Sequence, residues 1–149
     1  MQTLVSNTRP YSHSSPAMAV MVSLPLAVFS GAILTDGMYA RSSEIQWANF
    51  SAWLLAMGMA LGAICVLFEV FEAIRTPRAY RTSGAWWRVL ITIVALGVGL
   101  ANNFIHARDG WTSVMPSGLI LSVITVLLLL TAALVGSRRT YRDAIGDLP

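Results

Sequence analysis

The segment of residues 118–135, GLILSVITVLLLLTAALV, decides the fold class of this protein. It holds no charged side chain, and as a helix it would be about 27 Å long at about 1.5 Å per residue. That length is close to the roughly 30 Å thickness of the hydrocarbon core of a bilayer. Because a segment in lipid must satisfy its own backbone hydrogen bonds, we interpret it as a transmembrane helix.

Three further apolar blocks of similar length, at 18–36, 50–68 and 89–105, extend this pattern toward the amino terminus. Across the 149 residues, 56% are hydrophobic and only 11% are charged, and the mean hydropathy is +0.65. These values are typical of membrane proteins and not of soluble domains. We therefore predict an all-α integral membrane four-helix bundle.

The charged and polar residues divide the chain into three parts. A polar amino-terminal segment, 1–17, precedes a transmembrane domain at 18–136, and a basic tail follows at 137–149.

A secretory signal peptide has a basic amino-terminal region and a shorter apolar stretch. We therefore expect the first apolar block to be retained.

The arginines predict the orientation of the bundle. Eight lie before the first span, between the second and third, or after the fourth: Arg9, Arg75, Arg78, Arg81, Arg88, Arg138, Arg139 and Arg142. The other two, Arg41 and Arg108, share the opposite side with the acids Asp36, Glu44 and Asp109. The positive-inside rule then places both termini in the cytoplasm. We expect a multi-pass protein of the bacterial inner (cell) membrane.

Small and weakly polar residues recur at helical spacing within the spans. Lipid does not drive helices together hydrophobically, so close association relies on small residues and on hydrogen bonds between helices. The residues assigned to helix packing are Gly31, Gly58, Gly62, Gly99, Asn102 and Ser122. The same residues would serve either the interior of one bundle or contacts between copies.

Three short motifs resemble one family of bacterial membrane proteins. They are LPLA at 24–27, GAILTD at 31–36 and ARDG at 107–110, and the family is catalogued as domain of unknown function 2231. The resemblance extends from about residue 18 to 141. It implies a membrane bundle and provides no catalytic residue.

Members of that family often carry a His-Pro pair before the proline of the first span and a histidine near the start of the third. These histidines have invited comparison with haem-binding membrane cytochromes. Here Met18 and Ala19 stand in place of the pair, and the third span begins Trp86-Trp87-Arg88. The departure weakens a haem role inferred from the resemblance.

Glu69, at the inner end of the second span, is one candidate functional residue. An ionisable group at membrane depth is costly and often functional, so Glu69 is a possible ion or proton site. The alternative is a carboxylate that is hydrated or paired with Arg75 or Arg88.

His106, at the outer end of the third span, is the candidate cofactor-binding residue. With Met38, Met57 or Met115 it would offer an imidazole and a thioether, ligands that suit haem iron or copper(I). Methionine is also an ordinary packing residue. His13 lies on the opposite side of the predicted bilayer, so one haem cannot use both histidines.

No catalytic motif and no dedicated metal motif is found, and the loops are too short for a catalytic domain. We therefore expect a non-enzymatic structural or accessory bundle in the lipid bilayer, in a homo-oligomer or a larger membrane complex and without nucleic acid. The first alternative is a haem-binding redox protein that uses His106. The second is a small proton-linked transporter that uses Glu69.

Overall fold

The described residues fold into four long helices, as the sequence predicts. A computed structural model describes residues 16–75, 86–107 and 114–146, with side chains at 21, 23–75, 86–107 and 114–135. The helices are α1 (Pro16–Ser42), α2 (Ile45–Arg75), α4 (Trp86–His106) and α5 (Ser117–Gly146). They extend beyond the predicted apolar blocks, and α5 includes most of the segment that we assigned to the basic tail.

Several residues used to predict orientation lie outside this description. They are Arg9, His13, Arg78, Arg81, Arg108 and Asp109, together with the side chains of Arg138, Arg139 and Arg142. Arg41, Arg75 and Arg88 lie within it.

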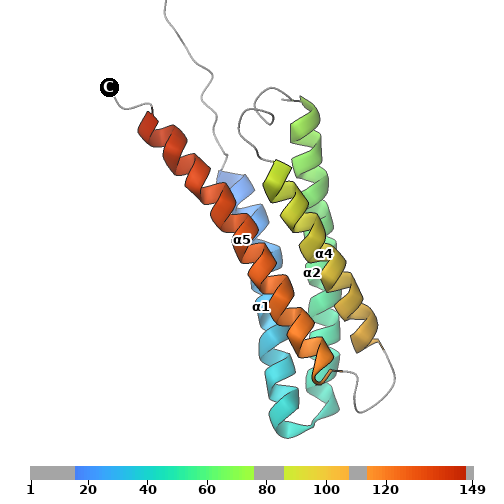
Figure 1. Ribbon diagram of the computed structural model, residues 1–149. Coiled ribbons are helices and arrows are strands. Elements are labelled where there is room, and N and C mark those ends of the chain that lie inside the picture. Colours follow the sequence, from blue (N-terminus) through green and yellow to red (C-terminus); the bar gives the residue numbers. More distant parts are fainter. Residues whose placement is uncertain (1–15, 76–85, 108–113, 147–149) are drawn as a thin grey trace, which may run out of the picture.

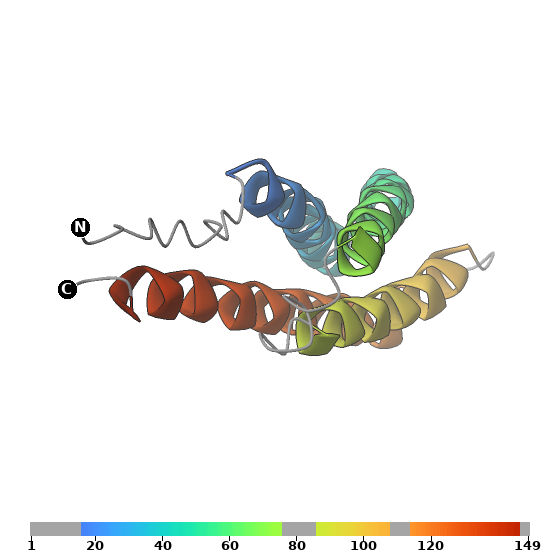
Figure 2. The same cartoon turned by 90° about the horizontal axis from the view of Figure 1, so that it is seen from above.

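The four helices run alternately up and down in one bundle (Figure 1). α1 packs against α2 and α5, and α4 packs against α5 and α2. Seen from above, α1 and α2 form one layer and α4 and α5 the other (Figure 2). We call the end where α1 begins and α5 ends the terminal end, and the opposite end, where α1 turns into α2, the turn end.

A tight turn joins α1 to α2 and makes the pair antiparallel. Ser43 has a positive φ of 56°, and its backbone N–H donates to the carbonyl of Tyr39 over 2.8 Å. This left-handed residue ends the helix in the manner of a C-terminal cap. The Ser42 hydroxyl donates to the Met38 carbonyl and accepts from the Glu44 N–H, so only two residues separate the helices.

Three helices, and not the four expected, are long and apolar enough to cross a membrane. They are α2, α4 and the Ser117–Val135 part of α5, among the residues that the structure describes. The side chains of α1 are described only at 21 and 23–42, and Ser23, Pro25, Ser30, Thr35 and Asp36 lower the mean hydropathy of that part. Its polar side chains include two that bond to neighbouring helices, Thr35 and Asp36.

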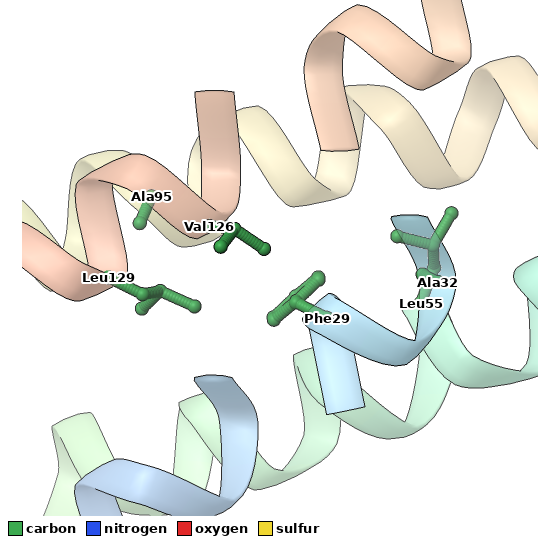
Figure 3. Close-up of a cluster of buried hydrophobic side chains, with 6 residues drawn as sticks. All are labelled: Phe29, Ala32, Leu55, Ala95, Val126 and Leu129. Carbon is green, nitrogen blue, oxygen red and sulfur yellow. The ribbon is translucent and has the colours of Figure 1, made fainter. Parts of the chain in front are cut away.

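Phe29 on α1 is the centre of the apolar core. It is fully buried and packs with Ala32, Leu55, Ala95, Val126 and Leu129 from all four helices (Figure 3). Two glycines make room for its ring. A Cβ added at Gly58 on α2 would lie 2.9 Å from Phe29 Cε2, and one at Gly99 on α4 would lie 3.1 Å from Phe29 Cζ.

The other predicted packing glycines also lie at helix interfaces. A Cβ at Gly31 on α1 would meet Leu54 of α2 at 3.4 Å, and one at Gly62 on α2 would overlap Leu96 of α4. Each glycine thus receives a large side chain from a neighbouring helix. This arrangement brings helix backbones close together without a hydrophobic driving force from water.

Gly58→Ala tests the packing around Phe29. The added methyl group has to displace a buried aromatic ring, and overpacking of this kind costs about 1–3 kcal/mol. We expect the free energy of unfolding in detergent to fall by about that amount. The matched control is Gly97→Ala on α4, where an added Cβ meets nothing within 4 Å. It should leave stability unchanged or slightly raised, and equal effects of the two changes would contradict this account of the core.

Candidate functional site

Four polar side chains from three helices meet at the turn end of the bundle. Asp36 comes from α1, Asn102 and His106 from α4, and Ser122 from α5. Asp36, Asn102 and Ser122 have no exposed surface, and the His106 side chain has none either. Asn102 and His106 are one turn apart on α4, so helical geometry places both on the same face.

Short hydrogen bonds connect these four side chains. His106 Nε2 lies 2.9 Å from Asp36 Oδ1, and the Ser122 hydroxyl lies 2.7 Å from Asp36 Oδ2. Asn102 contacts Ser122 Oγ at 2.8 Å. His106 Nδ1 lies 3.0 Å from the main-chain carbonyl oxygen of Asn102. Asp36 therefore joins α1 to both α4 and α5.

The Asn102 amide has two orientations with different consequences. With Nδ2 toward Ser122 Oγ, it makes one hydrogen bond of 2.8 Å, but its oxygen then faces the Gly118 carbonyl. In the reverse orientation Nδ2 donates to His106 Nδ1 over 3.2 Å and to the Gly118 carbonyl over 3.1 Å. Its oxygen then accepts from Ser122 Oγ over 2.8 Å and from Ser122 N over 3.3 Å. We adopt the second orientation because buried polar atoms are normally satisfied.

Gly118 at the start of α5 allows the network to close. A Cβ at this position would lie 2.7 Å from His106 Cε1. Any larger residue would therefore force the imidazole or the start of α5 to shift. The sequence places this glycine four residues before Ser122, on the same face of α5.

Asp36, which the arginine count grouped with the acids of the outer side, has a fully buried side chain at the turn end. Its partner His106 was identified as a cofactor ligand, and Asn102 and Ser122 were assigned only to packing. The sequence does contain a signal for the network. Asp36 is the last residue of the GAILTD motif and the last residue of its predicted span. The later spans carry polar residues at a similar depth.

His106 does not fit the proposed haem or copper site. Both ring nitrogens have protein neighbours within hydrogen-bonding distance, and the side chain is completely enclosed. The thioethers of Met38, Met57 and Met115 belong to side chains exposed on the bundle surface. No group of three or more His, Cys, Asp or Glu is placed to hold a metal ion in the described ranges.

Glu69 lies near the terminal end, where it pairs with Arg88 across α2 and α4. Its Oε1 lies 2.9 Å from Arg88 Nε, and the Glu69 side chain is 3% exposed. The second oxygen, Oε2, is buried without a hydrogen-bond partner among the described residues. An ion or proton site at Glu69 would therefore have to compete with the Arg88 guanidinium.

His106→Ala tests the network and the haem hypothesis together. Removing the imidazole leaves Asp36 Oδ1 buried without a donor, and an unsatisfied buried group costs about 1–3 kcal/mol. We expect the free energy of unfolding in detergent to fall by about that amount, with no change in visible absorbance. The control is Arg41→Ala, an exposed charge at the end of α1. Loss of a haem spectrum in His106→Ala would contradict the structural role.

The sequence match agrees with the architecture. No curated protein and no solved structure is significantly similar to the chain. A family model described as "Predicted membrane protein (DUF2231)" matches residues 14–149, nearly the whole sequence. A bundle with three helices suited to a bilayer fits that description. The chain therefore belongs to this family of predicted membrane proteins of unknown function.

Proposed function

We propose that this protein is a structural or accessory bundle within a larger membrane assembly. The observation that supports this most is how its buried polar groups are used. Asp36 bonds to both His106 and Ser122 on other helices, and Glu69 pairs with Arg88 on the neighbouring helix. These residues therefore hold neighbouring helices together.

The two polar clusters hold the bundle at opposite ends. The Asp36 network joins α1, α4 and α5 at the turn end, and the Glu69–Arg88 pair joins α2 and α4 near the terminal end. Between them lies the apolar core around Phe29. In a membrane, interhelical polar bonds and close packing provide much of the association between helices. The arrangement favours a rigid body over one that alternates between two open states.

The outward surface of the bundle is strongly apolar. Its most exposed large side chains are Trp53, Ile74, Leu34 and Leu67, each at least 70% exposed. They come from both α1 and α2. Because Leu34 on α1 is 72% exposed while Asp36 is buried, we propose that α1 crosses the bilayer beside the other three helices, with its polar residues turned inward.

We also propose that both ends of the chain face the cytoplasm of a bacterium, in its inner membrane. α1 begins and α5 ends at the terminal end (Figure 1). Arg75 closes α2 and Arg88 lies in the first turn of α4 at that same end. The excess of arginine on the cytoplasmic side is the normal determinant of orientation.

The proposed role in an assembly is tested by native mass spectrometry of the protein released from its own membranes. We expect species heavier than one 16.1 kDa chain. Integer multiples of that mass would identify a homo-oligomer, and other masses would identify a complex with further subunits. Recovery of a single chain with lipid alone, under conditions that keep a known membrane complex intact, would contradict the proposal.

The proposed orientation is tested by cysteine labelling. A Cys65→Ala background removes the only cysteine, and Glu44→Cys then places one in the exposed α1–α2 turn. We expect a membrane-impermeant maleimide to label this position from outside intact cells. Thr140→Cys in the carboxyl-terminal segment is the matched control and should react only after the membrane is opened. The reverse pattern would overturn the orientation.

A further inference from the structure

The hydrogen bonds at the turn end determine where the protons of the network lie. Each bond needs one hydrogen between its two heavy atoms, so a choice at one bond restricts the next. The decisive group is Asn102, because its amide nitrogen can only donate and its amide oxygen can only accept. Its orientation therefore fixes the direction of the Ser122 hydroxyl.

In the satisfied orientation, Asn102 Oδ1 lies 2.8 Å from Ser122 Oγ and must receive the Ser122 hydroxyl proton. Ser122 Oγ then has no hydrogen left for Asp36 Oδ2, which lies only 2.7 Å away. Two oxygens at that distance without a hydrogen between them would repel each other. The hydrogen has to come from Asp36.

We propose that Asp36 carries a proton on Oδ2, and that the four side chains form a closed, uncharged proton-binding site. Asp36 donates to Ser122, Ser122 donates to Asn102 Oδ1, and Asn102 Nδ2 donates to His106 Nδ1. His106 completes the ring by donating Nε2–H to Asp36 Oδ1 over 2.9 Å. Every bond of the ring then has one donor and one acceptor.

The proposed ring also requires His106 to be neutral. Nδ1 lies 3.2 Å from the Asn102 amide nitrogen and 3.0 Å from the Asn102 carbonyl oxygen. When Nδ1 is unprotonated, it accepts from the Asn102 side-chain amide. When Nδ1 is protonated, it donates to the Asn102 main-chain carbonyl. Beside a neutral Asp36, the protonated form would leave a net positive charge in a fully buried site. Desolvation of an unpaired charge is strongly unfavourable, so the uncharged ring is preferred.

None of the hydrogen bonds recorded for the four side chains of the ring involves another ionisable group of the described residues. Arg41 and Glu44 are exposed at the α1–α2 turn, and Tyr39 packs in a separate cluster with Ala48 and Val114. Glu69, Glu72 and Arg75 of α2 lie toward the terminal end. Arg88 of α4 lies at that end as well. Residues 117–135 of α5 have no charge, and Arg108 and Asp109 lie outside the described residues.

Release of the proton would change the contact between α4 and α5. As Asp36 becomes a carboxylate and its proton passes to water, Ser122 turns its hydroxyl toward Asp36. The Asn102 amide then rotates to donate Nδ2 to Ser122 Oγ, a contact of 2.8 Å. In that orientation its oxygen faces the Gly118 carbonyl oxygen at 3.1 Å. Proton binding therefore favours close packing of α5 on α4 at the turn end.

The proposal is tested by solid-state NMR of the full chain in liposomes at neutral pH. With aspartate labelled with ¹³C at Cγ, we expect one resonance at the position of a protonated carboxyl group. Additional ¹³C′-threonine and ¹⁵N-aspartate labels assign it without mutation, because Thr35-Asp36 is the only Thr-Asp pair in the sequence. An Asp36 resonance at the carboxylate position would overturn the proposal.

The histidine is observed in a His13→Gln variant, which leaves His106 as the only imidazole. With ¹⁵N-histidine, we expect Nε2 to carry a proton and Nδ1 to be bare. An imidazolium spectrum would overturn the uncharged ring. Ser122→Ala should shift the Asp36 carboxyl resonance by removing its acceptor, whereas Glu69→Gln, an acid replaced at the other end of the bundle, should leave it unchanged. A shift with Glu69→Gln alone would also contradict the proposal.

Discussion

The carboxyl group of Asp36 imposes the main constraint on this bundle. It is buried inside the bundle without access to water, so its hydrogen-bond partners have to come from other helices. They are His106 at the end of α4 and Ser122 in the second turn of α5. The register of α1 against both helices is therefore fixed at one depth. A shift of one residue on any of them would leave a buried polar group unsatisfied, which is unfavourable in a low-dielectric environment.

This constraint accounts for features that are otherwise unrelated. Gly118 is small because the His106 imidazole passes over it. The short α1–α2 turn, with Ser43 in a left-handed conformation, brings α2 back along α1. The Thr35 and Ser51 hydroxyls then meet at 2.7 Å, one residue from Asp36 along α1. Together these contacts place hydrogen bonds between α1 and each of the other three helices at the turn end.

The helical architecture could be predicted from the sequence because apolar block length is a one-dimensional property. The segment at 118–135 could be recognised as a helix without knowledge of its neighbours. Glycine positions such as Gly58 and Gly99 also followed from spacing along single helices. The central position of Phe29 could not be predicted, since nothing in its own helix indicates that two glycines on different helices face its ring.

The pairing of these polar residues could not be predicted from the sequence, for the same reason. Asp36 and Ser122 are 86 residues apart in sequence, and only the order and rotation of the helices bring them together. Asp36 near a span end, beside a glycine and a short loop, has the pattern of an interfacial acid. His106 has the pattern of a ligand when its partners are unknown. Glu69 was easier to interpret, because Arg88 was among a small number of cations on the same side.

The position of Phe29 between Gly58 and Gly99 has a consequence for sequence variation in this family. The Phe29 ring of α1 fills the space that side chains at Gly58 of α2 and Gly99 of α4 would otherwise occupy. An increase in side-chain size at either glycine is therefore relieved by a decrease at position 29. The three positions should therefore covary in related chains, and a smaller residue in place of Phe29 should occur with alanine or serine at one of the two glycines.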